Sequence, residues 1–339
     1  MEAANSNTPV PNATAAEQPA APVSTPPVDS GKPLPISAAL DAWEQVMVRT
    51  RRLLREDTID AAWVTQFTEL SMAIRRLSAR DADLALYVLI ESNGSHVEHY
   101  SAQHAMTCLV IAELAAEWMD WSEPEKRALA LAALSMNLSI TALQDSLAKQ
   151  SGALTDGQRE TVASHAAASA ELLERAGVAD PLWLHVVRHH HVAAPADGTA
   201  DMEAGWKLAE LLRRVDIYSA KLSRRGSRQS VTPAMAARDA CLNAGGHPDS
   251  IGATLLRVVG LYPPGTFVEL ANGETAVVIV RGTKAHTPIV ASMRRRDGGL
   301  LMQPLRRNTL RLDFAVKRGV EPSRVRVLLN HRRILSCAA

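Results

Sequence analysis

Several residue types are scarce in this 339-residue chain, and each shortage argues against a class of protein. The three cysteines, Cys108, Cys241 and Cys337, lie far apart and form no CxxC pair. Their spacing argues against a thiolate zinc site or a disulfide framework, and it fits a reducing cytoplasm. Aromatic residues make up only 4% of the chain, which disfavours a base-stacking surface. The formal net charge is +1, so no global field directs the protein to nucleic acid or to a membrane.

Longer signals are missing as well. No uncharged apolar run reaches the ~18 residues of a membrane span, and the N-terminus lacks the basic and apolar segments of a signal peptide. The chain has no Walker A loop, no GxSxG and no GxGxxG after a strand, so NTPase, serine hydrolase and Rossmann readings have no support. We therefore expect a cytoplasmic protein without a nucleic-acid or membrane partner.

The residue pattern of the chain predicts a mainly α-helical protein. Residues 1–35 are rich in Ala, Pro, Ser and Thr and are predicted to be disordered, because they have too little apolar surface to offset the entropy of ordering. Apolar residues recur at helical spacing in 36–95, which we interpret as a helical lead-in. Residues 96–250 form the main helical domain, in which Ser122/Glu125 and Thr155/Gln158 are capping boxes that predict two helix starts.

The pattern changes to alternation in the C-terminal part, 260–339. Asn272-Gly273 predicts a two-residue type I′ hairpin turn between two alternating runs. We expect a small antiparallel β unit with four strands, at about 266–270, 276–280, 288–293 and 300–305. The basic stretches of this region are interpreted as solvated surface; they are Arg294–Arg296, Arg306-Arg307, Lys317-Arg318 and Arg332-Arg333.

Histidines and one aspartate are spread along the main helical domain: His104, His165, the run His189–His191, and Asp216. A single histidine on an apolar face is usually a core or surface residue. Several histidines at the ends of successive helices suggest a metal site. Asp216, between Val215 and Ile217, is costly to bury unless its carboxylate is paired or coordinated. Imidazole and carboxylate donors suit Zn, Mn or Fe.

The order and spacing of these residues resemble the HD-GYP family of cyclic di-GMP phosphodiesterases, within the HD-domain phosphohydrolases. His104 matches the family's first histidine, and Leu154-Thr155 followed by His165 resembles its next step. The family's adjacent histidine pair corresponds to His189-His190 or to His190-His191, and its late aspartate corresponds to Asp216. Residues 261–270 resemble the small β unit that follows the catalytic domain in many members. The resemblance implies an HD-domain-like helical bundle.

The same resemblance shows what is missing. The family's His-Asp pair and its lysine fall on Ser135, Met136 and Ser139, and its Gly-Tyr-Pro tract is replaced by 192–204. In the family the aspartate bridges two metals that activate one shared hydroxide. Met136 offers only a soft thioether, and Ser135 is a poor substitute for imidazole. Met136 and Leu138 in place of a polar loop predict that the cavity is filled.

We therefore expect a catalytically inactive or strongly reduced signalling protein that binds cyclic di-GMP or a protein partner. A metal-free state is favoured, and the alternative is one divalent Fe, Mn or Zn ion held by His165, His190 and His191. A divergent metal-dependent phosphohydrolase is the alternative function. Arg224 and Arg225 are weak candidates for substrate binding, and a homo-oligomer is compatible with the sequence.

Overall fold

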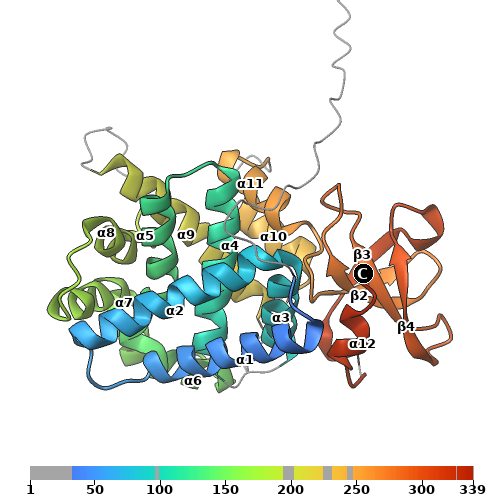
Figure 1. The fold of residues 1–339 in the computed structure, drawn as a ribbon, viewed down its shortest axis with the longest axis horizontal. Helices are drawn as coiled ribbons and strands as arrows, with labels where there is room; N and C mark the ends of the chain where they lie inside the picture. The colour runs from blue at the N-terminus through green and yellow to red at the C-terminus, as the bar shows by residue number, and fades with distance from the viewer. Residues whose placement is uncertain are drawn as a thin grey trace, which may run out of the picture.

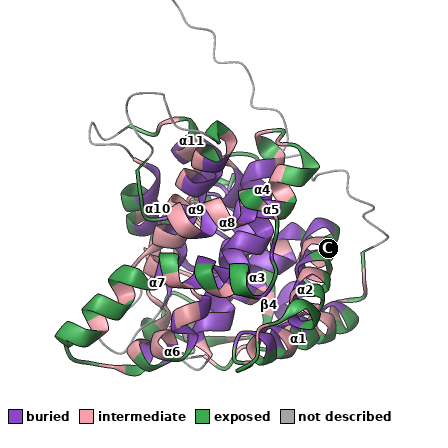
Figure 2. Ribbon diagram, turned by 90° about the vertical axis from the view of Figure 1, so that its left-hand side faces the viewer, coloured by how far each residue is buried: buried purple, intermediate pink, exposed green. Residues whose placement is uncertain are grey.

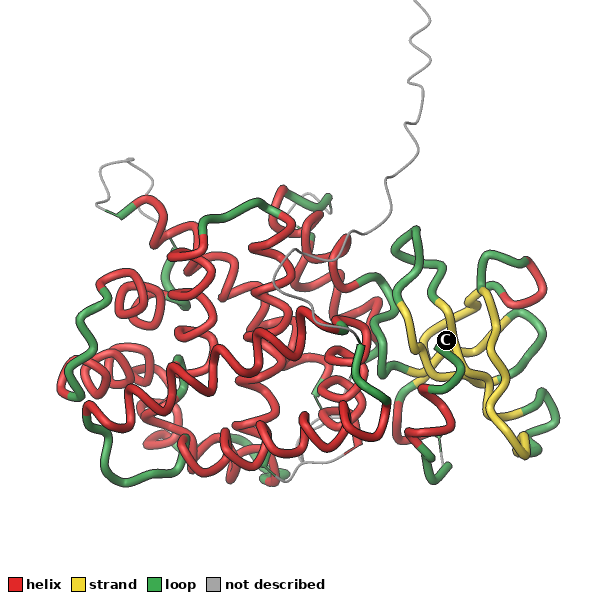
Figure 3. The backbone as a smooth tube through the Cα atoms, viewed as in Figure 1, coloured by secondary structure: helices red, strands yellow, loops and turns green. Residues whose placement is uncertain are grey.

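The computed structural model shows a helical body joined to a small β-sheet (Figure 1). It describes residues 33–95, 99–193, 202–223, 231–242, 247–325 and 327–338. The helices gather on one side and the strands on the other, as the colouring in Figure 3 makes clear. The expected fold class, mainly α with a C-terminal antiparallel β unit, is confirmed. Most of the predicted disordered tail, residues 1–32, lies outside the described residues.

The helices follow one another with short connections. They are α1 (Ile36–Leu53), α2 (Ala61–Arg80), α3 (Ala82–Ser95), α4 (Tyr100–Trp118), α5 (Glu123–Ser135), α6 (Thr141–Lys149), α7 (Asp156–Arg175), α8 (Pro181–His189), α9 (Glu203–Leu222), α10 (Pro233–Cys241), α11 (Ser250–Val259) and α12 (His331–Leu335). Short 3₁₀ turns lie at Leu138–Ile140, Leu312–Phe314 and Pro322–Arg324.

Both predicted capping boxes are present. The Ser122 and Thr155 side chains start α5 and α7, and Glu125 and Gln158 return hydrogen bonds to the cap backbone. Helix α4 is mostly apolar, and it is buried from Tyr100 to Ala116. Figure 2 shows it inside the helical body, with exposed faces on the helices around it. A helix of this composition is stable only when other helices cover every face.

The sheet contains five strands in the order β4-β3-β2-β1-β5, all antiparallel. They are β1 (Phe267–Leu270), β2 (Thr275–Val280), β3 (Ile289–Arg294), β4 (Leu300–Asn308) and β5 (Val316–Val320). The first four match the predicted runs, whereas β5 was not predicted. The predicted type I′ turn is wrong: φ is positive at Gly273 and not at Asn272, and the Gly273 N–H donates to the Leu270 carbonyl.

One apolar core joins the sheet to the helices. Phe267, Val277 and Met293 belong to the same buried cluster as the helix side chains, while Val268 and Val278 face a second, smaller cluster. Contact between the two parts is close at Gly265, where an added Cβ would lie 2.7 Å from the Tyr87 carbonyl oxygen. The sheet and the helices therefore share one continuous hydrophobic core.

Among the described residues, one stretch, Glu123–Lys149, is long and apolar enough by composition to cross a membrane. Within it, 72% of the most apolar window is buried inside the protein. Burial of this kind is expected for a core helix, and it accounts for the apolar composition of the stretch.

Candidate metal centre

Three of the histidines predicted from the sequence and the predicted aspartate line one pocket of about 220 Å³. His104 comes from α4, His165 from α7, His191 follows α8, and Asp216 comes from α9. The remaining lining includes both polar and apolar residues: Tyr100, Asn137, Ile140, Gln144, Leu147, Gln150, Gly152, Leu154, Val162 and Ala220. Gly152, Leu154 and His191 are exposed, so the pocket opens to solvent.

Three histidines form the first candidate metal site. The nearest ligand nitrogens of His165, His190 and His191 all lie within 4.8 Å of one another. His165 and His190 are buried, and His191 is exposed at the mouth of the pocket. Of the three consecutive histidines, His190 and His191 are the two whose rings contact the His165 ring. His189 instead packs on His185 and Trp206.

Backbone contacts fix the orientation of two of these rings. The Nδ1 atom of His165 lies 2.5 Å from the Val162 carbonyl oxygen, and Nδ1 of His190 lies 2.8 Å from the Val187 carbonyl oxygen. Since a carbonyl oxygen only accepts, each Nδ1 must carry a proton. In a neutral imidazole the other nitrogen, Nε2, then holds a free lone pair.

The two Nε2 atoms lie 3.3 Å apart and face each other. Neither can donate when both rings are neutral, so the two lone pairs repel unless a proton or a cation lies between them. Burial, followed by the charge of His191, lowers the pKa of His190 to about 3, which disfavours a shared proton near neutral pH. The separation matches the roughly 3.3–3.4 Å between nitrogen ligands of a tetrahedral zinc ion. These residues therefore fit a divalent metal.

His104 and Asp216 form a second group that also lines the pocket. Nε2 of His104 lies 2.8 Å from Oδ1 of Asp216, and Nδ1 lies 3.2 Å from the Ser219 hydroxyl. Tyr100 stacks on the His104 ring with 5.4 Å between ring centres. Sγ of Cys108, one helical turn after His104, lies 3.7 Å from Nε2. Cys108 was not predicted as a site residue, because it was interpreted as part of an apolar helix.

The charge states in this second group follow from its contacts. Burial alone would raise the pKa of Asp216, but the hydrogen bond and charge of His104 outweigh it, so the pKa lies well below its usual value. Burial raises the pKa of the Cys108 thiol well above its ordinary value. Without a metal, the group is therefore an ionised carboxylate paired with His104 beside a neutral thiol.

The positions predicted to have lost the His-Asp pair serve the core. Ser135 is fully buried, and its hydroxyl donates to the Leu131 carbonyl while accepting the indole N–H of Trp183 at 2.9 Å. Met136 is buried in the main cluster. Ser139 donates to the main-chain carbonyl of His165 at 3.0 Å. Neither Ser135 nor Met136 is among the pocket-lining residues.

The expectation of a filled cavity is only partly right. Met136 and Leu138 are buried, but the pocket persists beside them, with Asn137 in its wall. Arg224 and Arg225, the weak candidates for substrate binding, lie outside the described residues. In the ranges that the structure covers, no lysine or arginine lines the pocket.

Comparison with known proteins gives one distant match of interest. The chain is 25% identical over 197 residues to a protein of Pseudomonas aeruginosa named cyclic di-GMP phosphodiesterase PA4108. The match covers 57% of this chain and 48% of the relative, so the chain spans about half the length of the protein it matches. No protein-family model matches the chain, and no solved structure matches it. The similarity supports a related signalling or phosphohydrolase role.

Proposed function

We propose that this protein is a signalling domain of HD-GYP descent that keeps one metal ion, binds a cyclic dinucleotide such as cyclic di-GMP, and does not hydrolyse it at a normal rate. The observation that carries this proposal is the pair of facing Nε2 atoms of His165 and His190 beside an open pocket. This differs from the metal-free state that the sequence favours, because the sequence does not reveal that the two lone pairs point at each other.

Loss of normal turnover is inferred from what lies where a bridging carboxylate would be needed. Two-metal hydrolysis requires a ligand shared between ions ~3.5–4 Å apart. Ser135 and Met136 are buried in the core, and Ser135 already satisfies Trp183. In the second group, His104 and Asp216 hydrogen-bond to each other. When bound, the metal would supply a positive charge and a Lewis acid at the three histidines.

Ligand binding is supported by the pocket's remaining chemistry. Because no lysine or arginine lines the pocket among the described residues, the attraction for a phosphate would come from the metal. Oε1 of Gln144 is buried without a hydrogen-bond partner in the part of the chain that is described. A buried acceptor of this kind is stabilised by a donor such as a nucleobase N–H. The name of the distant relative makes cyclic di-GMP the first ligand to test.

The test is metal content followed by turnover. Purified protein should carry one tightly held divalent metal, and His165→Ala should lose it. His286→Ala removes an exposed loop histidine and should leave the metal in place. With Mn(II) or Fe(II) added, cyclic di-GMP should not be hydrolysed above the rate of the His165→Ala variant. Rapid hydrolysis that His165→Ala abolishes would instead establish a divergent phosphodiesterase, and wild-type protein without metal would contradict the retained site.

A further inference from the structure

The net charge of +1 averages two parts of the chain that carry opposite charge. The C-terminal part, 260–339, contains 14 lysines and arginines against 5 aspartates and glutamates, which gives it a net charge of +9. Residues 1–259 therefore carry a net charge of −8. The expectation of no membrane partner rests on the charge of the whole chain, which does not describe the β unit. By itself the β unit is basic enough to attract an anionic surface.

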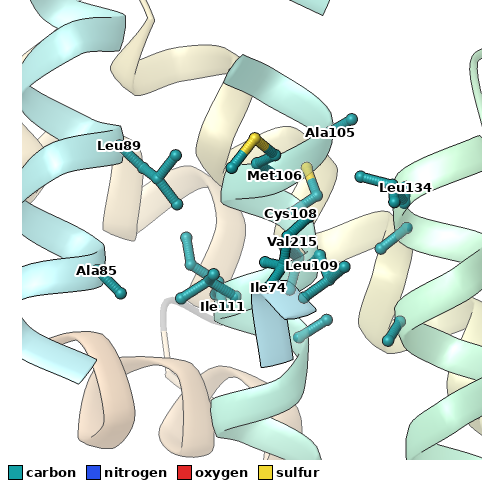
Figure 4. Close-up of a cluster of buried hydrophobic side chains, with 14 of the residues drawn as sticks. Ile74, Ala85, Leu89, Ala105, Met106, Cys108, Leu109, Ile111, Leu134 and Val215 are labelled. Atoms are coloured by element: carbon teal, nitrogen blue, oxygen red, sulfur yellow. The ribbon is translucent and has the colours of Figure 1, made fainter. Parts of the chain in front are cut away.

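Large apolar side chains are exposed on this basic unit. Among the described residues, the most exposed of them are Leu328, Met302 and Leu312, at 100%, 93% and 87% of their full area. Side chains of the same kind, such as Met106 and Leu109, are buried in the core of the helical body (Figure 4). A single exposed leucine is ordinary in a soluble protein, but several that lie together mark an interaction surface.

Leu300, Met302 and Leu328 line one mostly apolar groove of about 200 Å³. The edge strand β4 forms one side of the groove, and the segment 327–334, which includes most of α12, forms the other. Figure 1 shows β4 at the opposite end of the molecule from α7, which carries His165. No residue lines both the groove and the candidate metal pocket, so the two are separate.

Four exposed arginines accompany the groove: Arg295, Arg306, Arg332 and Arg333. Arg333 lines the groove and follows Arg332 on α12, whereas Arg306 lies on β4 and Arg295 in the hairpin before it. Other arginines of the β unit pair with glutamates, but none of these four has a carboxylate partner in the ranges that the structure covers. Asp297, the acid of the hairpin, accepts the Gly299 N–H. The four positive charges are therefore available to a partner.

We propose that the groove and its four arginines, together called the β4 face, bind the surface of an anionic lipid membrane. Leu300, Met302 and Leu328 would enter the boundary between headgroups and acyl chains, where binding strength grows with the apolar area buried. The guanidinium groups would bind lipid phosphates. Arginine suits this position because its aliphatic stem lies along apolar surface while its charged end stays among the headgroups.

The chemistry of the β4 face argues against other occupants. A second copy that used the same face would bring like charges together, which is unfavourable. Nucleic acid would need bases to stack on aromatic rings, but Tyr262, Phe267 and Phe314, the aromatic residues of the β unit, are buried or half-buried. An acidic protein would be held through well-packed pockets. Projecting aliphatic side chains such as Leu328 instead suit a fluid acyl layer that adapts to their shape.

Vesicle sedimentation with the full chain tests the β4 face. The protein should sediment with vesicles of equal parts phosphatidylcholine and phosphatidylglycerol, and it should stay in solution with phosphatidylcholine alone. High salt should weaken the binding, because the arginine charges are screened. Metal-free protein and His165→Ala should sediment like wild type, so this test and the test of the proposed function fail independently.

Two multiple variants separate the contributions of charge and apolar area. The first removes the four arginines and should bind roughly 100-fold more weakly or worse, since each arginine near an anionic surface strengthens binding about fivefold. It carries Arg295→Gln, Arg306→Gln, Arg332→Gln and Arg333→Gln. The second removes the apolar side chains and should bind at least about tenfold more weakly. It carries Leu300→Gln, Met302→Gln and Leu328→Gln.

Matched controls remove the same number of side chains from exposed positions on the helices and should bind like wild type. The charge control carries Arg76→Gln, Arg80→Gln, Arg127→Gln and Arg175→Gln. The apolar control carries Val48→Gln, Met72→Gln and Met235→Gln. If circular dichroism shows that a multiple variant misfolds, Leu328→Gln alone tests the same face, because this side chain is fully exposed.

Three results would overturn the proposal. The first is wild-type protein that does not sediment with the anionic vesicles. The second is an equal loss of binding in the control variants and in the β4-face variants. The third is binding to soluble polyglutamate without binding to vesicles, which would assign the β4 face to an acidic protein.

Discussion

Trp183 donates its indole N–H to the Ser135 hydroxyl at 2.9 Å, at the position where the resemblance to HD-GYP proteins leads us to expect a metal-binding histidine. Trp183 is buried, and its ring is nearly parallel to Phe67, with 6.3 Å between ring centres. The Ser135 hydroxyl is therefore part of the hydrogen bonding that supports the core.

The hydrogen bond predicts that Ser135→Ala is destabilising. The substitution leaves the buried Trp183 N–H without an acceptor, which should lower the free energy of unfolding by about 1–3 kcal/mol. Urea unfolding measures the change. Ser146→Ala, on the exposed face of α6, is the matched control and should stay within about 0.5 kcal/mol of wild type. An equal effect of both substitutions would show that the Trp183 contact contributes nothing.

Restoring the signature should not restore chemistry. In the double variant Ser135→His/Met136→Asp, a carboxylate and an imidazole enter a core in which both positions are at most 1% exposed. Unfolding free energy should fall by about 3 kcal/mol or more, because the new charge is buried without a partner. Cyclic di-GMP turnover should stay at background. A stable variant that binds two metals and hydrolyses the ligand would show that only the pair had been lost.

The three-histidine site predicts a specific response to chelation. Removing the metal returns the repulsion between the facing Nε2 atoms of His165 and His190, so chelator should lower the melting temperature of wild-type protein. His165→Ala removes one of the two lone pairs, and its melting temperature should not respond to chelator. Thermal scans with and without chelator check this, with His286→Ala as a control that should behave like wild type. A chelator response in His165→Ala would place the metal elsewhere.

His185 predicts how stability depends on pH. Its pKa is lowered to about 4, first by burial and then by the charge of His189, and its Nε2 atom is buried without a hydrogen-bond partner in the described structure. The unfolded chain takes up a proton near pH 6.5, whereas the folded chain does so only near pH 4. The contribution of the neutral, buried His185 ring to the free energy of unfolding is therefore complete above pH 6.5, and it is lost as the pH falls toward 4.

The measurement for His185 is the free energy of unfolding at several pH values between 4 and 7. His185→Gln should reduce the slope in this range, since the variant has no proton to take up at that position. His286→Ala should keep the wild-type slope, because the substitution removes an exposed loop histidine and leaves His185 in place. Equal slopes in wild type and His185→Gln would contradict the burial of this ring as a neutral group.

The junction between sheet and helices can be tested at Gly265. Its φ is +90°, and an added Cβ would lie 2.7 Å from both the Glu91 nitrogen and the Tyr87 oxygen. Gly265→Ala should therefore separate the β unit from α3 and make the chain more sensitive to limited proteolysis. Gly152→Ala is the control, since nothing lies within 4 Å of its added Cβ. Unchanged proteolysis of Gly265→Ala would show that the junction tolerates a shift.

The sequence predicts the fold well wherever a local signal exists. Ser122 and Thr155 fix two helix starts through their caps, and alternation fixes the first four strands. The short strand β5 was missed because Lys317-Arg318-Gly319 has no alternating apolar pattern, and it is held by its partner β1. Helix α11, Ser250–Val259, was also not predicted, although Asp249 caps it.

The site was predictable in composition and not in geometry. Spacing along the sequence indicates His104, His165 and Asp216 as site residues. It cannot show which of the three consecutive histidines point toward His165, since that depends on how α8 packs on α7. Cys108 carries the right spacing from His104, yet on a mostly apolar helix the same spacing is expected of core residues. The direction of each lone pair depends on backbone carbonyls that no side-chain pattern reveals.

The central claim is that the pocket binds a cyclic dinucleotide through one retained metal without turning it over. Calorimetric titration of cyclic di-GMP into metal-loaded wild-type protein, repeated after chelation, tests this most directly, with chromatography of the ligand afterwards. The account predicts saturable binding of intact ligand that chelation abolishes and metal restores. Binding that is unchanged by chelation, no binding by the metal-loaded protein, or recovery of the ligand as linear product would contradict it.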